Sequence, residues 1–230
     1  MVKLMTNTKN TIICNSLDLL LKLVYGSDKA AIIPESIIDF ENRRRFNKIE
    51  FGILVSDKKI LEENRGSKGV VYMTVAYYKK ATVFSHIHPR NNGIIGGTFS
   101  YTDLDNFVEF TNLRTYRAVA REGIYSITKL KNFDSNLAKA YKKYNNKIDK
   151  ETDKLIDIEK QKLDDLYVFL QRQLNIGILT QEMSDRIYEN AENDYLKKYN
   201  SIYNLYLIKA HNWLIKNQKK YEYSYGLIAI

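Results

Sequence analysis

The segment Val83-Phe84-Ser85-His86-Ile87-His88-Pro89 contains two of the three histidines of the chain, and Ser100-Tyr101-Thr102-Asp103 follows it after a loop. The β-branched and aromatic residues of the first stretch predict a strand, which the proline ends. Successive side chains of a strand point to opposite faces, so His86 and His88 project from the same face, about 7 Å apart along the chain. This spacing suits two ligands of one metal ion.

The loop between the two stretches contains three glycines and can turn the chain back toward the histidines. Ser100 then begins a predicted helix, which places Asp103 in its first turn. Two histidines and one carboxylate leave a fourth tetrahedral position for water, and this is the pattern of a catalytic zinc site. The sequence thus predicts Zn²⁺ held by His86, His88 and Asp103.

Each part of this pattern also has an ordinary structural interpretation. Ser100 and Asp103 fit a capping box, in which the serine caps the helix and the residue three positions later bonds back to the serine amide. A His-x-His pair on a strand is common on an exposed polar face. The metal hypothesis depends on the histidine strand, the glycine loop and the helix start converging on one point.

In this order, His86-Ile87-His88-Pro89 and Ser100-Tyr101-Thr102-Asp103 resemble the JAMM motif of the JAB/MPN metallopeptidases. The resemblance covers roughly residues 36 to 130, with a loop longer than the commonest version of the motif. It implies a zinc-dependent peptidase or isopeptidase that acts on a protein or peptide substrate. It also implies that Ser100 donates a hydrogen bond to the oxyanion of the tetrahedral intermediate.

The family motif further includes a glutamate at the start of an early strand, Glu-x-x-Gly-hydrophobic-Leu, which serves as the general base. Glu50-Phe51-Gly52-Ile53-Leu54 is similar but has one residue fewer between the glutamate and the glycine. The resemblance therefore implies Glu50 as the base, with Glu35 as the alternative if the register differs. Glu50 also has a simpler interpretation, as a charged residue at the start of a strand.

The remainder of residues 1–131 predicts an α+β domain with a mostly antiparallel sheet and flanking helices, as in the JAB/MPN fold. Hydrophobic periodicity and turn residues place the elements. We expect helices at 16–25 and 35–46 and strands at 11–14, 48–56, 70–78, 81–88, 115–120 and 123–130. Residues 57–69 are expected to form one turn or mobile loop.

Residues 132–230 have a different pattern, with apolar and tyrosine residues at three- and four-residue steps between charged ones. This predicts two long amphipathic helices that break at 175–180 and pack as an antiparallel, coiled-coil-like hairpin. The first would extend about 60 Å at 1.5 Å per residue. The second carries His211, which we expect to have an ordinary structural role, and residues 221–230 form a β-prone tail that could join a sheet edge or an interface.

The helical hairpin supports an alternative function. Its length and its many tyrosines are typical of a surface that binds a partner, because aromatic residues are enriched in interface cores. On this hypothesis the first domain is a non-catalytic scaffold of JAB-like fold, and the hairpin mediates oligomerisation or binds another protein.

Composition limits the remaining classes. The 230-residue chain is 44% hydrophobic and 27% charged, and it contains no apolar run long enough to span a bilayer. The first residues lack a signal-peptide core, so the predicted compartment is the cytoplasm, without membrane association. Residues 1–131 carry 20 Lys and Arg against 13 Asp and Glu, which includes Arg43-Arg44-Arg45. Nucleic-acid binding is the least favoured class, because no nucleic-acid motif accompanies this charge.

Overall fold

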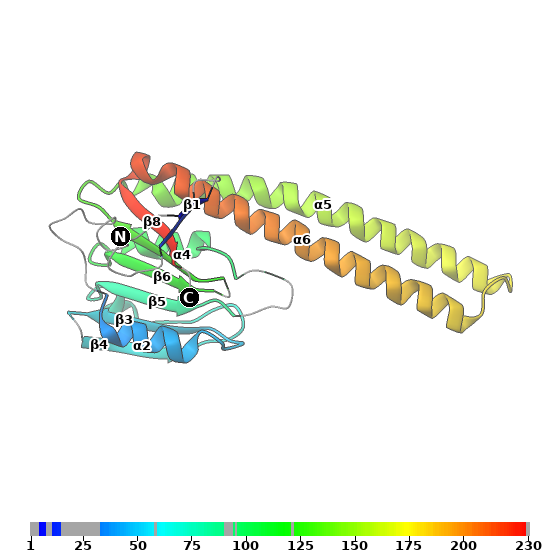
Figure 1. The fold of residues 1–230 in the computed structure, drawn as a ribbon, viewed down its shortest axis with the longest axis horizontal. Coiled ribbons are helices and arrows are strands. Elements are labelled where there is room, and N and C mark those ends of the chain that lie inside the picture. The colour runs from blue at the N-terminus through cyan, green and yellow to red at the C-terminus, as the bar shows by residue number, and fades with distance from the viewer. Residues whose placement is uncertain are drawn as a thin grey trace.

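The computed structural model describes residues 5–7, 11–14, 33–57, 59–89, 94, 96–120 and 122–228. It confirms the α+β class: a mostly antiparallel sheet is followed by a long helical pair that projects from it (Figure 1). In chain order the elements are β1 (Met5–Asn7), β2 (Thr11–Cys14), α2 (Glu35–Arg44), β3 (Phe51–Ser56), β4 (Lys59–Arg65), α3 (Val75–Tyr78), β5 (Val83–Ile87), α4 (Tyr101–Glu109), β6 (Thr115–Val119), β7 (Ile124–Lys129), α5 (Asn136–Asn175), α6 (Gln181–Tyr221) and β8 (Tyr223–Ile228).

The strands form one sheet in the order β1-β2-β8-β7-β6-β5-β3-β4. Among the described strands, β2 with β8 and β5 with β6 run parallel, and every other neighbouring pair is antiparallel. The β-prone tail is therefore an inner strand, β8, which lies between β2 and β7. The chain leaves the sheet after β7, forms the helical hairpin of α5 and α6, and returns to the same sheet.

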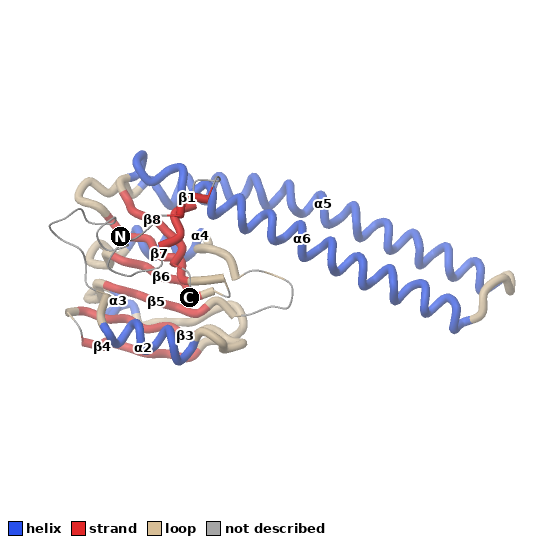
Figure 2. The backbone as a smooth tube through the Cα atoms, in the orientation of Figure 1, coloured by secondary structure: helices blue, strands red, loops and turns tan. Residues whose placement is uncertain are grey.

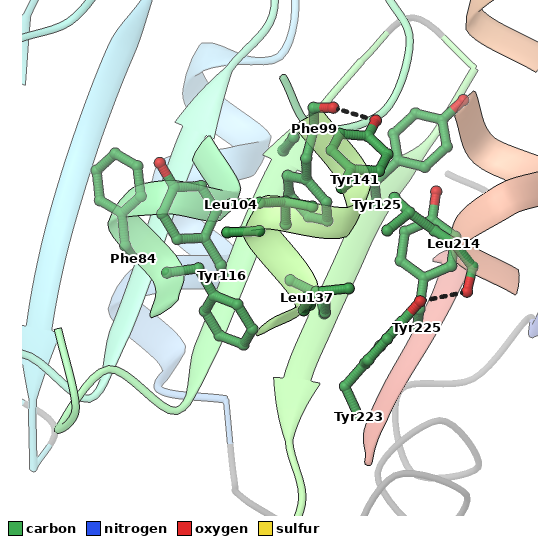
Figure 3. Close-up of a cluster of buried hydrophobic side chains, with 14 of the residues drawn as sticks. Phe84, Phe99, Leu104, Tyr116, Tyr125, Leu137, Tyr141, Leu214, Tyr223 and Tyr225 are labelled. Atoms are coloured by element: carbon green, nitrogen blue, oxygen red, sulfur yellow. Dashed lines mark hydrogen bonds between the residues drawn. The ribbon is translucent and has the colours of Figure 1, made fainter. Parts of the chain in front are cut away.

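The two faces of the sheet are covered by different helices (Figure 2). On one face, Ile37 and Phe40 of α2 pack against apolar residues of β3 and β5. The other face is covered by α4 and by the ends of α5 and α6 next to the sheet, where Tyr141, Leu214 and Tyr223 join a large aromatic core (Figure 3). Because side chains alternate along β5, Val83, Ser85 and Ile87 face α2, whereas Phe84 and His86 lie on the face that α4 covers.

The prediction of a loop at 57–69 is wrong, because Lys59–Arg65 forms β4 at the edge of the sheet. It pairs antiparallel with β3, and the connection begins at Asp57, whose backbone φ is 45°. Short polar residues such as aspartate tolerate this left-handed conformation. The charged composition that indicated a loop is instead that of an edge strand, where lysine and glutamate discourage pairing with other chains.

The strand predicted at 70–78 is also wrong. Its first half has no regular structure and its second half is the short helix α3. The Glu62 carboxylate accepts hydrogen bonds from the Thr74 amide at 2.8 Å and from its hydroxyl at 2.9 Å, just before α3 begins. Val71 and Met73 meanwhile lie directly above Gly52, where a Cβ atom would contact both side chains. The segment therefore crosses over the sheet face and does not pair with a strand.

The other predicted elements that the structure describes are confirmed within a few residues, and the helix predicted at 16–25 lies outside the described residues. The two hairpin helices contain 40 and 41 residues, so each is about 60 Å long. Among the described helices, none combines the length and apolar character that a bilayer span requires. The expected division at residue 131, and the cytoplasmic compartment, stay predictions.

Candidate metal centre

His86 and His88 lie at the end of β5, on the face that α4 covers. The Nε2 atoms of the two rings are 2.9 Å apart. His86 is buried between aromatic rings, stacked on Phe84 with Tyr116 at its edge, while His88 is half-buried and one residue beyond the strand. The His88 amide still donates to the Val119 carbonyl of β6 at 2.8 Å, which keeps the backbone extended and both rings on one face.

The loop that follows fixes the orientation of His88. Its Nδ1 atom lies 3.0 Å from the Gly96 carbonyl oxygen and 3.1 Å from that of Gly97. Because carbonyl oxygens only accept, Nδ1 must carry the ring proton, which leaves the Nε2 lone pair directed at His86. A metal-ligating histidine is held in the same way, with its second nitrogen donating to a backbone carbonyl.

The same two glycines are held from the other side by Glu122. Its carboxylate accepts hydrogen bonds from the Gly96 amide at 2.9 Å, from the Gly97 amide at 2.8 Å and from the Tyr125 hydroxyl at 2.7 Å. Gly97 has φ +76°, and a Cβ there would lie 2.7 Å from Leu207 of α6. The backbone conformation therefore favours glycine at this position, and any larger residue would also require the Leu207 side chain to shift.

Asp103 uses its two carboxylate oxygens differently. Oδ2 accepts from the Ser100 amide and hydroxyl, each at 2.7 Å, and the Asp103 amide donates to the Ser100 Oγ atom, which forms the capping box of α4. Oδ1 accepts from the Tyr116 hydroxyl at 3.1 Å and lies 3.6 Å from the His86 Nε2 atom. The helix cap and the predicted ligand are thus two roles of one side chain.

The local electrostatics favour the protonation states that a metal site needs. Burial lowers the pKa of His86 to about 4; Asp103 and the Arg117 backbone oppose this shift and His88 adds to it. Burial alone would raise the pKa of Asp103, but the two histidines and the Ser100 hydrogen bonds hold it below its ordinary value. At neutral pH the cluster therefore presents a neutral imidazole and a carboxylate, which are the forms that bind metal.

Two of the three separations between the donor atoms are close to those of a zinc site. One ligand atom from each of His86, His88 and Asp103 lies within 4.8 Å of the other two. Zinc–nitrogen bonds of about 2.0–2.1 Å set the donor atoms of a regular tetrahedron about 3.3 Å apart. The observed separations of 2.9 and 3.6 Å lie on either side of that value.

Glu50 shares a cavity of ≈ 230 Å³ with His88 and Ser100. Burial raises its pKa to about 7; the charge of Asp103 adds to the rise, and a hydrogen bond from the Val71 backbone opposes it. A carboxyl group with such a pKa can both accept and return a proton near neutral pH. Glu35, the alternative base, is exposed on α2, across the sheet from this cavity. Of the two candidates, the structure therefore brings only Glu50 to the cluster.

Ser100 lies beside the cluster, but its hydroxyl already donates to Asp103. An oxyanion role would require this hydroxyl to turn away, so that role stays a prediction and the observed role is to position Asp103. His211 is outside the cluster: its Nδ1 atom is 2.6 Å from the Tyr225 hydroxyl, which is 2.7 Å from the Thr98 hydroxyl. It supports the core next to the 96–98 loop.

Sequence reasoning missed Tyr116 and Glu122, which hold the carboxylate and the loop in place. Neither residue belongs to the motif, and no local pattern distinguishes them from other strand or turn residues. Comparisons of the chain with protein-family models, with curated proteins and with solved structures each find no match. The resemblance to the JAB/MPN family therefore rests on the motif residues alone and stays a prediction.

Proposed function

We propose that the chain is a JAB/MPN-like, zinc-dependent hydrolase that cleaves a peptide or isopeptide amide bond. One observation carries the proposal: the donor atoms of His86, His88 and Asp103 converge within 4.8 Å, and Glu50 lines the same cavity as His88. Three protein ligands, one of which (His88) lines a cavity, resemble the arrangement of catalytic zinc sites, whereas structural sites use four protein ligands.

Each residue has a defined task in this reaction. His86, His88 and Asp103 would hold the ion, and Tyr116 and Ser100 keep the Asp103 carboxylate aimed at it. A bound Zn²⁺ would lower the pKa of a coordinated water and polarise the amide carbonyl. Glu50 accepts the proton of the attacking water and returns it to the leaving amine, a role that its raised pKa supports.

The catalytic part is tested with Glu50→Gln, and Glu35→Gln is the matched control on the opposite face of the sheet. Zinc-loaded protein is assayed on a pool of quenched fluorescent peptides and on an ε-linked lysine isopeptide. We expect Glu50→Gln to keep its zinc and to lose about 10²- to 10⁴-fold in rate, the usual contribution of a general base. Glu35→Gln should retain both. Zinc-loaded wild-type protein that cleaves neither bond would contradict the proposal.

A second candidate function, a non-catalytic interaction protein, is favoured by the outer part of the helical hairpin. Large apolar side chains are exposed there on both helices, including Leu155, Ile158, Val168, Phe169 and Ile187. Exposed apolar surface of this kind marks contact sites between proteins. Sedimentation of the purified chain tests it: association that Phe169→Ser disrupts would support a self-contact, and a monomer at all concentrations would count against one.

A further inference from the structure

A row of tyrosines on α6 leads into the cavity beside the metal cluster. Tyr203 and Tyr206 line this cavity, and Tyr199 and Tyr195 continue the row along the helix toward its N-terminus. The centroids of neighbouring rings are 6.3, 6.2 and 5.6 Å apart along the row. All four side chains are half-buried, so part of each ring stays accessible. We call these four residues the tyrosine track.

Packing of the core accounts for only one end of the track. Of the four tyrosines, Tyr206 packs against the aromatic core. Tyrosines that clearly belong to this core are closed to solvent: Tyr141 and Tyr223 are 0 and 1% exposed. Accessible aromatic rings that continue out of a candidate active site are suited to binding another molecule, because aromatic residues are enriched in interface cores.

The spacing of the track matches that of an extended peptide. Its tyrosines are three or four residues apart, and four residues of a helix rise about 6 Å. Alternate side chains of an extended chain lie on one side and repeat at about 6.6 Å. Alternate residues of a peptide that lies along α6 would therefore each meet one ring. From Tyr195 to Tyr206 the helix rises about 16 Å, which is the length of about five extended residues.

Two carboxylates of α5 flank the end of the track next to the cavity. Asp149 and Asp153 are exposed and four residues apart, so they lie on one side of the helix. Burial raises the pKa of Tyr206 to about 12, and the charges of Asp149 and Asp153 add to the rise. Burial also raises the pKa of Tyr203, with Asp149 contributing.

These carboxylates are available to a cation. Within the described part of the chain, no ion pair includes Asp149 or Asp153. A guanidinium or ammonium group is attracted to the face of an aromatic ring, and it can pair with a carboxylate at the same time. Aromatic rings beside two unpaired carboxylates therefore favour a peptide with basic side chains.

We propose that the tyrosine track, together with Asp149 and Asp153, binds an extended peptide segment with arginine or lysine at alternate positions and guides it into the cavity. This inference rests on the proposed function and deepens it, because it identifies the substrate as a flexible, basic segment next to the bond that is cut. It also makes the helical hairpin part of the site.

The test measures binding to zinc-free protein and does not require turnover. The probe is an end-blocked Gly-Gly-Arg-Gly-Arg-Gly-Gly peptide, and its control carries citrulline, which has nearly the same shape without the charge, in place of both arginines. In peptide NMR titrations at low salt, we expect wild-type protein to bind the citrulline peptide about 5- to 30-fold more weakly. The preference should shrink as salt is added, because salt screens exposed charges.

Paired aspartate variants locate the preference. Asp149→Asn combined with Asp153→Asn should reduce it to about 3-fold or less, because only the contact with the rings remains. Asp165→Asn combined with Asp185→Asn removes the same charge from exposed positions farther along the hairpin and should keep it. Equal binding of the two peptides by wild-type protein, or an equal loss of preference in both double variants, would overturn the proposal.

A tyrosine variant tests the aromatic part. Tyr203→Leu should weaken binding of the arginine peptide about 2- to 5-fold, whereas Tyr167→Leu, at an exposed position of α5, should not. If the arginine peptide is preferred as expected but zinc-loaded protein cleaves no bond, the track stands and the hydrolase proposal fails. If zinc-loaded protein cleaves the arginine and citrulline peptides at the same rate, the hydrolase proposal stands and the track fails.

Discussion

A buried ion pair joins α2 to the sheet under the metal cluster, on the opposite face. Arg117 of β6 is 1% exposed and donates to the Glu41 carboxylate at 2.7 and 2.8 Å, and the Ser85 hydroxyl donates to the same carboxylate at 2.7 Å. Ser85 is the β5 residue that precedes His86. Changes in this ion pair should therefore alter the packing of the strand that carries the histidines.

Glu41→Gln should destabilise the protein by about 3–5 kcal/mol. The substitution keeps the shape of the side chain but leaves the guanidinium charge of Arg117 buried without a counter-charge, and removing one partner of a buried pair has this cost. For a chain of this size the midpoint of thermal unfolding falls by about 2–4 °C per kcal/mol, so the expected shift is about 6–20 °C. Urea denaturation followed by circular dichroism measures the free energy of unfolding directly.

Two controls distinguish the cost of leaving a buried charge unpaired from the cost of losing an ion pair in general. Glu63 pairs with Arg44, also of α2, at 3.1 Å, but at an exposed position, so Glu63→Gln should cost about 1 kcal/mol or less. The double variant Glu41→Leu with Arg117→Met should recover most of the loss, because an apolar pair has no desolvated charge to compensate. A cost of Glu41→Gln no greater than that of Glu63→Gln, or a double variant as unstable as the sum of its single changes, would show that burial of the Arg117 charge is not the cause.

Three further predictions concern the cluster. In zinc-free protein, the folded state binds an extra proton at Glu50 between pH 4.5 and about 7, because the pKa of Glu50 is raised from 4.5 to about 7. The stability of wild-type protein relative to Glu50→Gln should therefore fall as pH rises through this window. A difference in denaturation midpoints that does not change with pH would contradict this prediction. Glu122→Ala should weaken zinc binding about 10- to 100-fold in chelator competition, because the carbonyls that hold His88 lose their anchor; unchanged affinity would show that the loop holds itself. Ser100→Ala should lose about 1 kcal/mol of stability and also zinc affinity, whereas Thr180→Ala, which removes the cap of α6, should lose stability alone.

Local rules predicted most of this fold. Alternation in β5, the cap at Ser100 and the three- and four-residue periodicity after residue 132 each depend on neighbours in sequence, so the histidine strand, α4 and the hairpin were predicted correctly. The two wrong elements depend on distant contacts. Strand β4 exists because it pairs with β3, and residues 70–74 are kept from forming a strand by the Glu62 carboxylate and by packing above Gly52.

The residues of the candidate site also divide into those that local sequence patterns predict and those that only tertiary contacts bring to the site. The motif spacing identified the three residues that converge, because a strand places its alternate residues on one face and a cap places its third residue at the helix start. The supporting residues were not predictable in this way. Tyr116 reaches Asp103 from a strand that pairs with β5 in parallel, and Tyr206 reaches the cavity from a helix that begins 78 residues after Asp103. Only the tertiary structure brings them together.

The metal content of the purified protein shows whether His86, His88 and Asp103 form a zinc site. Protein purified without a histidine tag is offered zinc, dialysed and analysed for elements, beside His88→Ala, Asp103→Asn and the control Asp105→Asn, which changes an exposed residue of the same helix. We predict about one zinc per chain in wild-type protein and in Asp105→Asn, and little in the other two. Wild-type protein without metal, or Asp103→Asn with a full equivalent of zinc, would contradict the account.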